Sequence, residues 1–160
     1  MNSATAGHFL KRHANTHFML VRIDHVAIAV RSIDTALDTF SRLLGGKALH
    51  ITIEELPQHH VRVAFLSLGE TRIEFLEPLS AQSPVAKFLE QRGEGLHHIA
   101  FASTNLEQDL HTAQRQGFQA LAAPTRGAEQ ALVSFLHPKD LHGVLVELLE
   151  KVKPDLPPTA

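Results

Sequence analysis

An internal repeat constrains this chain more than any other feature of its sequence. Residues 23–29 run apolar, polar, His, β-branched, Ala, apolar, Ala, and the segment from Gly95 to Phe101 has the same shape. The histidines at the centre of the two segments, His25 and His98, are 73 residues apart. A two-copy repeat of this size predicts two similar supersecondary units, each too small to bury a sheet face alone.

The first unit is predicted to have the order βαβββ. Alternating apolar residues indicate strands, and the apolar spacing of residues 32–44, which Gly45 ends, indicates a helix. The strand from Val21 to Val30 places His25 between alanines on one face and a fully apolar set on the other. The expected strands lie at residues 21–30, 47–53, 61–68 and 71–77.

The second unit is predicted to repeat this order after a connector helix at about residues 83–93, where Ser83 is the N-cap and Pro84 lies in the first turn. A helix begins at Asn105, and the segment from Pro124 to Gly127 marks a break. The expected strands lie at residues 96–103, 118–122, 131–136 and 143–150.

The predicted fold class is therefore α+β, with two tandem βαβββ modules forming a curved sheet around a metal-containing cleft and helices on the convex side. We expect a domain at residues 19–150, with module 1 at about 21–79 and module 2 at about 94–150. Residues 1–18 are expected to be a disordered extension, or the result of a start codon placed ahead of Met19. Residues 151–160, rich in proline, are expected to fray.

Composition excludes several classes of function. The net charge of −2 gives no electrostatic reason to expect a nucleic-acid or membrane partner. The chain has no cysteine, which excludes disulfides, zinc–thiolate sites and thiol nucleophiles and fits a cytoplasmic location. Any metal must be held by histidine and carboxylate, and the chain has 12 histidines.

Two glutamates share the offset of the two histidines. Glu74 and Glu147 are 73 residues apart, each on the last strand of its unit, with phasing that turns them to the face opposite the apolar residues. Two imidazoles and two carboxylates suit a divalent first-row ion such as Co, Mn, Ni, Fe or Zn. Such an ion stabilises the enolate that forms when a carbon beside a carbonyl loses a proton. The sequence thus predicts the metal ligands His25, Glu74, His98 and Glu147.

The remaining histidines are given lesser roles. A single strand histidine is more often a hydrogen-bonded structural residue, and by the phasing of the repeat His97 faces away from His98 and is interpreted as structural. Three histidines near strand ends could line the cleft, and three others are interpreted as surface residues: His59, His60 and His137, and His50, His111 and His142, respectively.

The segments around these residues resemble the methylmalonyl-CoA epimerases, a branch of the vicinal oxygen chelate superfamily that also holds glyoxalase I. The resemblance covers about residues 19–150, and its most specific part is His137-Pro138-Lys139 followed by Gly143-Val144-Leu145-Val146-Glu147-Leu148. It implies the same four metal ligands, an acyl-CoA substrate, a homodimer, and inversion at the carbon between the thioester and the carboxylate of methylmalonyl-CoA. It implies that Glu147 carries one of the two protons.

The chain also departs from that family. Glu74 stands where some members have Gln, and Val63 stands where some have a Glu that is a candidate second base. The second proton carrier is therefore Glu74, His60 or a water on the metal. Substrate-binding residues are not identified, although three segments that differ from the family could shape the acyl-CoA pocket: 59–60, 127–130 and 140–142.

Three other functions are compatible with the repeat. A glyoxalase I-like lyase or isomerase would act on a thiol adduct. A non-enzymatic binding protein of the drug-sequestering kind would need the cleft without a complete ligand set. An iron oxygenase would use two histidines and one carboxylate, which the second carboxylate at Glu74 disfavours.

Overall fold

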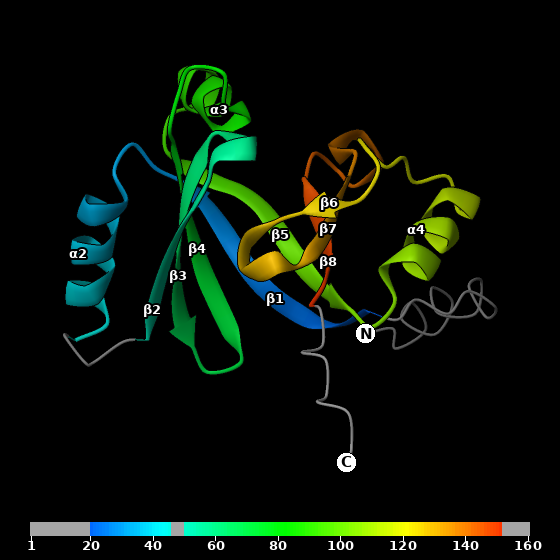
Figure 1. Ribbon diagram of the computed structural model, residues 1–160, viewed down its shortest axis with the longest axis horizontal. Coiled ribbons are helices and arrows are strands. Elements are labelled where there is room, and N and C mark those ends of the chain that lie inside the picture. Colours follow the sequence, from blue (N-terminus) through cyan, green and yellow to red (C-terminus); the bar gives the residue numbers. More distant parts are fainter. Residues whose placement is uncertain (1–19, 46–49, 152–160) are drawn as a thin grey trace, which may run out of the picture.

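A computed structural model describes residues 20–45 and 50–151, and these form one eight-stranded, strongly curved sheet with three α-helices (Figure 1). The order across the sheet is β2-β3-β4-β1-β5-β8-β7-β6. The two predicted modules therefore meet at β1 and β5, which run antiparallel in the middle of the sheet. The predicted fold class is confirmed. The expected extension at residues 1–18 and the tail beyond Lys151 lie outside the described residues.

The first module has the predicted order. Its strands are β1 (Leu20–Ala29), β2 (Ile51–Leu56), β3 (Val61–Leu68) and β4 (Thr71–Pro78), and its helix is α2 (Ile33–Leu43). A 3₁₀ turn, η2 (Pro57–His59), joins β2 to β3. The strand expected at residues 47–53 begins at Ile51, and residues 46–49 lie outside the described part.

The second module differs from the prediction at two of its strands. Its elements are β5 (Gly95–Ser103), α4 (Leu106–Arg115), β6 (Thr125–Arg126), η3 (Ala128–Gln130), β7 (Leu132–Leu136), η4 (Pro138–Asp140) and β8 (Val146–Glu150). The strand expected at residues 118–122 is reduced to one bridge, Ala120 to Leu136, and β6 lies where a break was predicted. Pro124 explains the interruption because it has no backbone N–H to donate to a ladder. β8 begins three residues later than predicted, after Gly143 in the left-handed region.

The helices of the two modules cover the outer face of the sheet. α2 packs on an apolar cluster that includes Ile33, Leu66 and Phe75, and α4 packs on a second cluster that includes Leu106 and Leu148. The connector helix α3 (Pro84–Arg92) instead packs against the inner face, where Val85 and Leu89 join the cluster around Val63. α3 therefore closes one end of the concave side, while the outer helices fix which face of each strand turns inward.

The last strand of each module also holds the start of its helix. The backbone N–H of Ile33, at the start of α2, donates to Glu77 Oε2 at 2.6 Å, and that of Leu106, at the start of α4, donates to Glu150 Oε2 at 2.8 Å. These contacts satisfy N–H groups that have no partner within the helix, and they place a negative charge at its positive end. The internal repeat thus includes the hydrogen bonds that attach the helix of each module to its sheet.

Candidate metal centre

The four predicted ligands meet on the concave side of the sheet. His25 comes from β1, Glu74 from β4, His98 from β5 and Glu147 from β8, which are the four central strands. All four are almost fully buried, with exposed fractions of 3%, 5%, 5% and 6%. Parallel pairing of β1 with β4, and of β5 with β8, brings each glutamate beside the histidine strand of its own module.

The reactive atoms of these side chains lie close together. His25 Nε2 is 3.2 Å from His98 Nε2 and 3.3 Å from both Glu74 Oε2 and Glu147 Oε2. His98 Nε2 is 2.8 Å from Glu147 Oε2 and 3.5 Å from Glu74 Oε2. His25, His98 and Glu147 each offer one ligand atom within 4.8 Å of the others. Glu74 is not part of that group of three, but its Oε2 lies within 3.5 Å of Nε2 of both histidines.

These donors fit a divalent ion. Both Nδ1 atoms have a partner on the far side of the ring: Asp24 Oδ1 at 3.1 Å from His25 Nδ1, and His97 Nδ1 at 2.9 Å from His98 Nδ1. Each ring can therefore keep its proton on Nδ1 and use the lone pair of Nε2 for coordination. Two carboxylates balance the charge of a divalent cation, which would otherwise be costly to bury.

The electrostatics of the cluster favour a positive charge at its centre. Burial opposes a charge on His25, but hydrogen bonds with Asp24, Glu147 and Glu74 outweigh it and raise the pKa of His25 to about 11. Burial raises the pKa of Glu147, yet the hydrogen bonds with His25 and His98 bring it below the usual range. The cluster therefore favours a cation at its centre, whether that cation is a protonated imidazole or a metal ion.

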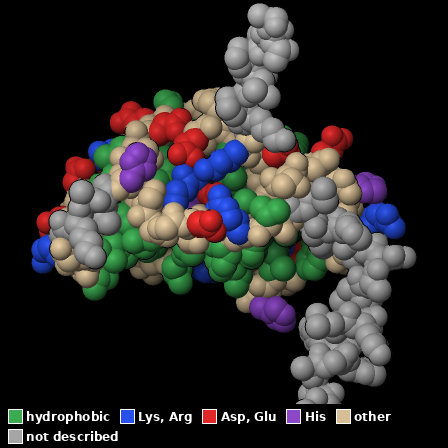
Figure 2. Space-filling view, turned by 90° about the horizontal axis from the view of Figure 1, so that it is seen from below, with side chains coloured by type: hydrophobic (Ala, Val, Ile, Leu, Met, Phe, Trp, Pro, Cys, Tyr) green, Lys and Arg blue, Asp and Glu red, His purple; other side chains and the backbone are tan. Residues whose placement is uncertain are grey.

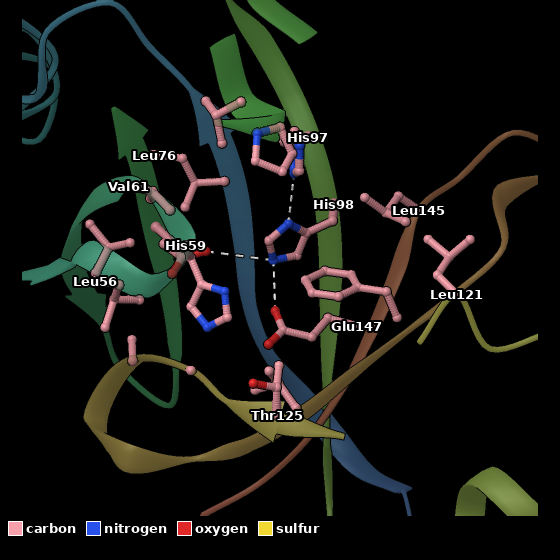
Figure 3. Close-up of a pocket in the computed structure, with 18 residues that line it drawn as sticks. Leu56, His59, Val61, Leu76, His97, His98, Leu121, Thr125, Leu145 and Glu147 are labelled. Atoms are coloured by element: carbon pink, nitrogen blue, oxygen red, sulfur yellow. Dashed lines mark hydrogen bonds and ion pairs between the residues drawn. The ribbon is translucent and has the colours of Figure 1, made fainter. Parts of the chain in front are cut away.

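His97 lies on the same side as His98, contrary to the prediction that it faces away. Ala27 pairs with His98 and Ile28 pairs with Leu96, so β5 contains one extra residue, His97, opposite β1. Such a bulge interrupts the alternation of side chains. His97 contacts His98, packs edge-on against Phe88 with ring centroids 4.9 Å apart, and lines the cavity (Figure 3). Burial, followed by repulsion from His98, lowers its pKa to about 4.

A cavity of about 390 Å³ is lined by three of the four residues, Glu74, His98 and Glu147. Figure 3 shows Leu56, Val61 and Leu76 on one side of it and Leu121 and Leu145 on the other, with His98 and Glu147 between them. The titratable side chains in its wall are those of His59, Glu74, His97, His98 and Glu147. The cavity is thus an apolar chamber with its polar groups gathered at one place, as small-molecule sites usually are.

The other histidines lie as follows. His59 lines the cavity, and its Nε2 is 2.7 Å from the backbone carbonyl oxygen of Arg126. His60 has left-handed backbone and is not among the lining residues, while His137 Nδ1 accepts a hydrogen bond from the backbone N–H of Lys139. His50, His111 and His142 are exposed, as predicted. Val63 lines the cavity, so its position faces the site.

An ionic network behind His25 was not predicted. Asp24 is fully buried and pairs with Arg72, and Arg72 Nη1 donates to Glu129 Oε2 at 2.8 Å. Lys151 Nζ lies 3.4 Å from Glu129 Oε2 and extends the network. When the molecule is seen from below, basic and acidic side chains gather near the middle of the surface (Figure 2). The sequence signal that could have indicated this network is the acidic residue Asp24 directly before His25. His97 occupies the equivalent position before His98 in the second module.

The same network ties the segment after β6 to the first module. Gly127 and Ala128 line the cavity, and the backbone N–H of Glu129 donates to Glu54 Oε2 of β2 at 2.9 Å. Glu129 and Gln130 both have positive φ, of 53° and 59°. Non-glycine residues rarely adopt this conformation unless their surroundings hold them in it. Contacts with Glu54, Arg72 and Lys151 thus hold the wall of the cavity in place.

Comparison with known proteins identifies the family. The sequence profile of the Glyoxalase/Bleomycin resistance protein/Dioxygenase superfamily matches residues 24–136. The chain belongs to this superfamily. It is 38% identical to the mitochondrial methylmalonyl-CoA epimerase of Homo sapiens over 131 residues, which cover 81% of this chain and 73% of the human protein. It is also 38% identical to the ethylmalonyl-CoA/methylmalonyl-CoA epimerase of Cereibacter sphaeroides, covering 81% of this chain and 98% of that protein.

Solved structures agree with the sequence relatives. A variant of the Streptomyces coelicolor methylmalonyl-CoA epimerase, in complex with 2-nitronate-propionyl-CoA, superposes with a TM-score of 0.77 at 35% identity, over 84% of this chain and 99% of that one. The Mycobacterium tuberculosis methylmalonyl-CoA epimerase gives a TM-score of 0.79 at 30% identity, over 89% and 95%. The predicted resemblance is confirmed, and the chain falls within a branch of isomerases.

Proposed function

We propose that this protein is a metal-dependent epimerase that inverts the α-carbon of methylmalonyl-CoA. The observation that carries the proposal is the convergence of His25, His98, Glu74 and Glu147, of which the last three line an apolar cavity. The names of the sequence relatives, and the acyl-CoA analogue in the S. coelicolor complex, support an acyl-CoA substrate.

The same four side chains would hold the ion. The chain has no cysteine, so an ion here takes only nitrogen and oxygen donors, which suits Co, Mn, Ni or Zn without selecting among them. A divalent ion at this place would act as a Lewis acid, stabilising the negative charge that develops on the thioester oxygen when the α-proton leaves.

The residues of the chain then supply the proton transfers. Inversion requires one group to remove the α-proton and another to return a proton on the opposite face of the same carbon. Glu147 and Glu74 come from opposite modules and both line the cavity, so we assign them as the two carriers. Val63 has no ionisable group at the position where some relatives have a Glu, and His60 is not among the lining residues, which leaves Glu74 as the better second carrier.

The walls of the cavity also support the reaction. Leu76, Val133 and Phe135 line the same cavity as the carboxylates, and Phe135 packs edge-on against His98 with ring centroids 5.2 Å apart. Apolar walls exclude water, which strengthens the electrostatic stabilisation of the enolate. They also hold the imidazole of His98 in one orientation.

The test is exchange of the α-proton in D₂O. The metal-loaded protein is mixed with methylmalonyl-CoA, and deuterium at the α-carbon is followed by mass spectrometry against a blank without enzyme, because this proton exchanges slowly by itself. We expect fast exchange that EDTA abolishes and that Glu147→Gln reduces by about 10²- to 10⁴-fold. The matched control is Glu55→Gln, which removes an exposed carboxylate of β2 and should leave the rate unchanged.

Exchange no faster than the blank, with metal confirmed bound, would overturn the proposal and direct the work to glyoxalase-type thiol adducts. A homodimer and a cytoplasmic location stay predictions. Among the described residues, no helix has the length and apolarity needed to cross a membrane.

A further inference from the structure

Each candidate metal-binding histidine follows a residue that breaks the regular strand. In β1, Ile23 pairs with Phe101 and His25 with Ala100, so Asp24 is an extra residue opposite β5. In β5, His97 is the extra residue opposite β1, as described above. Asp24 and His97 are equivalent in the repeat, since each stands immediately before its histidine. Bulges re-aim side chains, and both of these bring neighbouring residues to the same side of the sheet.

Both extra residues contact the same atom of the histidine that follows. Asp24 Oδ1 is 3.1 Å from His25 Nδ1, and His97 Nδ1 is 2.9 Å from His98 Nδ1. Figure 3 shows His97 on one side of the His98 ring and Glu147 on the other. Each imidazole is therefore contacted at Nδ1 by the preceding residue, while its Nε2 faces the other candidate ligands.

We propose that Asp24 and His97 are a pair of positioning residues that accept the Nδ1–H of His25 and His98 and so fix both rings for coordination through Nε2. This inference rests on the metal site of the proposed function and adds two residues to it. When Nε2 of His98 coordinates, the proton of that ring resides on Nδ1 and donates to His97 Nδ1. His97 must then carry its own proton on Nε2.

The two supports differ in chemistry. Asp24 is an anion held by the partly buried Arg72, and a carboxylate acceptor increases the basicity of the histidine it supports. His97 accepts as a neutral imidazole and is fixed by packing against Phe88. The two histidines of the site are thus equivalent in the repeat but differ in the acceptor behind them.

The first experiment measures Co²⁺ affinity of the full chain after removal of metal with a chelator. Absorption in the visible range reports Co²⁺ coordination directly, without any assay of activity. We expect His97→Phe, which keeps the packing but removes the acceptor, to raise the Kd for Co²⁺ by about 10- to 100-fold and to change the Co²⁺ spectrum. His97→Asn places an amide oxygen near the position of Nδ1 and should restore most of the affinity.

Asp24→Asn should also raise the Kd for Co²⁺, because it retains an acceptor but loses the negative charge. The matched control is Asp109→Asn in α4, which alters an aspartate that is equally buried but lies outside the site and accepts from Ser103 Oγ at 2.6 Å. This control should leave the Kd for Co²⁺ unchanged. Circular dichroism of each variant identifies any that fail to fold.

The second experiment needs no variant. Long-range ¹H–¹⁵N correlation spectra of the Zn²⁺-loaded protein, labelled with ¹⁵N-histidine, report which ring nitrogen carries each proton. We expect His98 to be protonated on Nδ1 and His97 on Nε2.

Four outcomes would count against the inference. A His97 ring protonated on Nδ1, or equal Co²⁺ affinity in the parent, His97→Phe and Asp24→Asn, would overturn the inference and leave the metal site standing. Equal losses in His97→Phe and His97→Asn would overturn the hydrogen-bonding role of His97. Failure of the parent chain to bind Co²⁺ would overturn the metal site itself, and the inference with it.

Discussion

His25 Nε2 lies 3.2 Å from His98 Nε2, at the seam where the two modules join. β1 and β5 pair antiparallel, so the approximate two-fold axis of the repeat passes between these strands. A residue near this axis lies close to the equivalent residue of the other module. The His and Glu of one module therefore meet the His and Glu of the other, which gives a set of four. His25 and His98 are both buried at this seam, and a buried charged cluster needs internal compensation.

Removal of metal should destabilise the protein. A ligand that binds only the folded state stabilises it by about 2.7 kcal/mol at a free concentration 100 times its Kd. We therefore expect EDTA to lower the Tm in differential scanning calorimetry, and excess Co²⁺ or Zn²⁺ to restore it. The Tm of His98→Ala should not respond to either addition. An equal response of this variant and the parent would show that the ion binds elsewhere.

Glu74→Gln tests whether this carboxylate is a ligand, a proton carrier or both. An amide oxygen can still coordinate but cannot accept a proton at neutral pH. We expect Co²⁺ binding to persist in Glu74→Gln and to weaken strongly in Glu74→Ala, with α-proton exchange reduced in both. Full exchange activity in Glu74→Gln would assign the second proton to another group.

The contacts of Glu129 should make part of the stability dependent on pH. Burial raises the pKa of this carboxyl, but the hydrogen bond and charge of Arg72, with Lys151, lower it overall below the ordinary value of 4.5. A group whose pKa is lower in the folded state contributes stability above its unfolded pKa and loses it as pH falls through the folded pKa. Thermal unfolding should therefore show a lower Tm for Glu129→Gln than for the parent at pH 7, and a smaller difference near pH 3. A difference independent of pH would contradict this.

The helix contacts of Glu77 and Glu150 should contribute equally in the two modules. Each carboxylate accepts the first backbone N–H of a helix, and loss of such a contact costs about 0.5–2 kcal/mol. We expect Glu77→Leu and Glu150→Leu each to lower the free energy of unfolding in urea by that amount, with little change for Glu70→Leu on the exposed turn after β3. Unchanged stability in either variant would show that the contact is not needed to dock the helix.

Most of the fold and all four candidate ligands could be predicted from local patterns in the sequence. Alternation along β1 and β4 separates the inward His25 and Glu74 from the outward Ile28 and Phe75, and the repeat transfers this pattern to the second module. The inward or outward direction of these side chains could be predicted because the side-chain period of a strand is a property of the strand itself. A full strand was predicted at residues 118–122, but only one bridge forms there, because pairing depends on partners that alternation does not reveal.

Two features were decided only by the tertiary structure. His97 turns toward the site because β5 takes an extra residue opposite β1, and the sequence of β5 alone does not say where the two strands fall out of register. Asp24 joins Arg72, Glu129 and Lys151, which come from three other parts of the chain. The sequence determined which residues face inward, because that follows from local geometry. The structure decided which of them touch, because contact depends on register between strands that are distant in the chain.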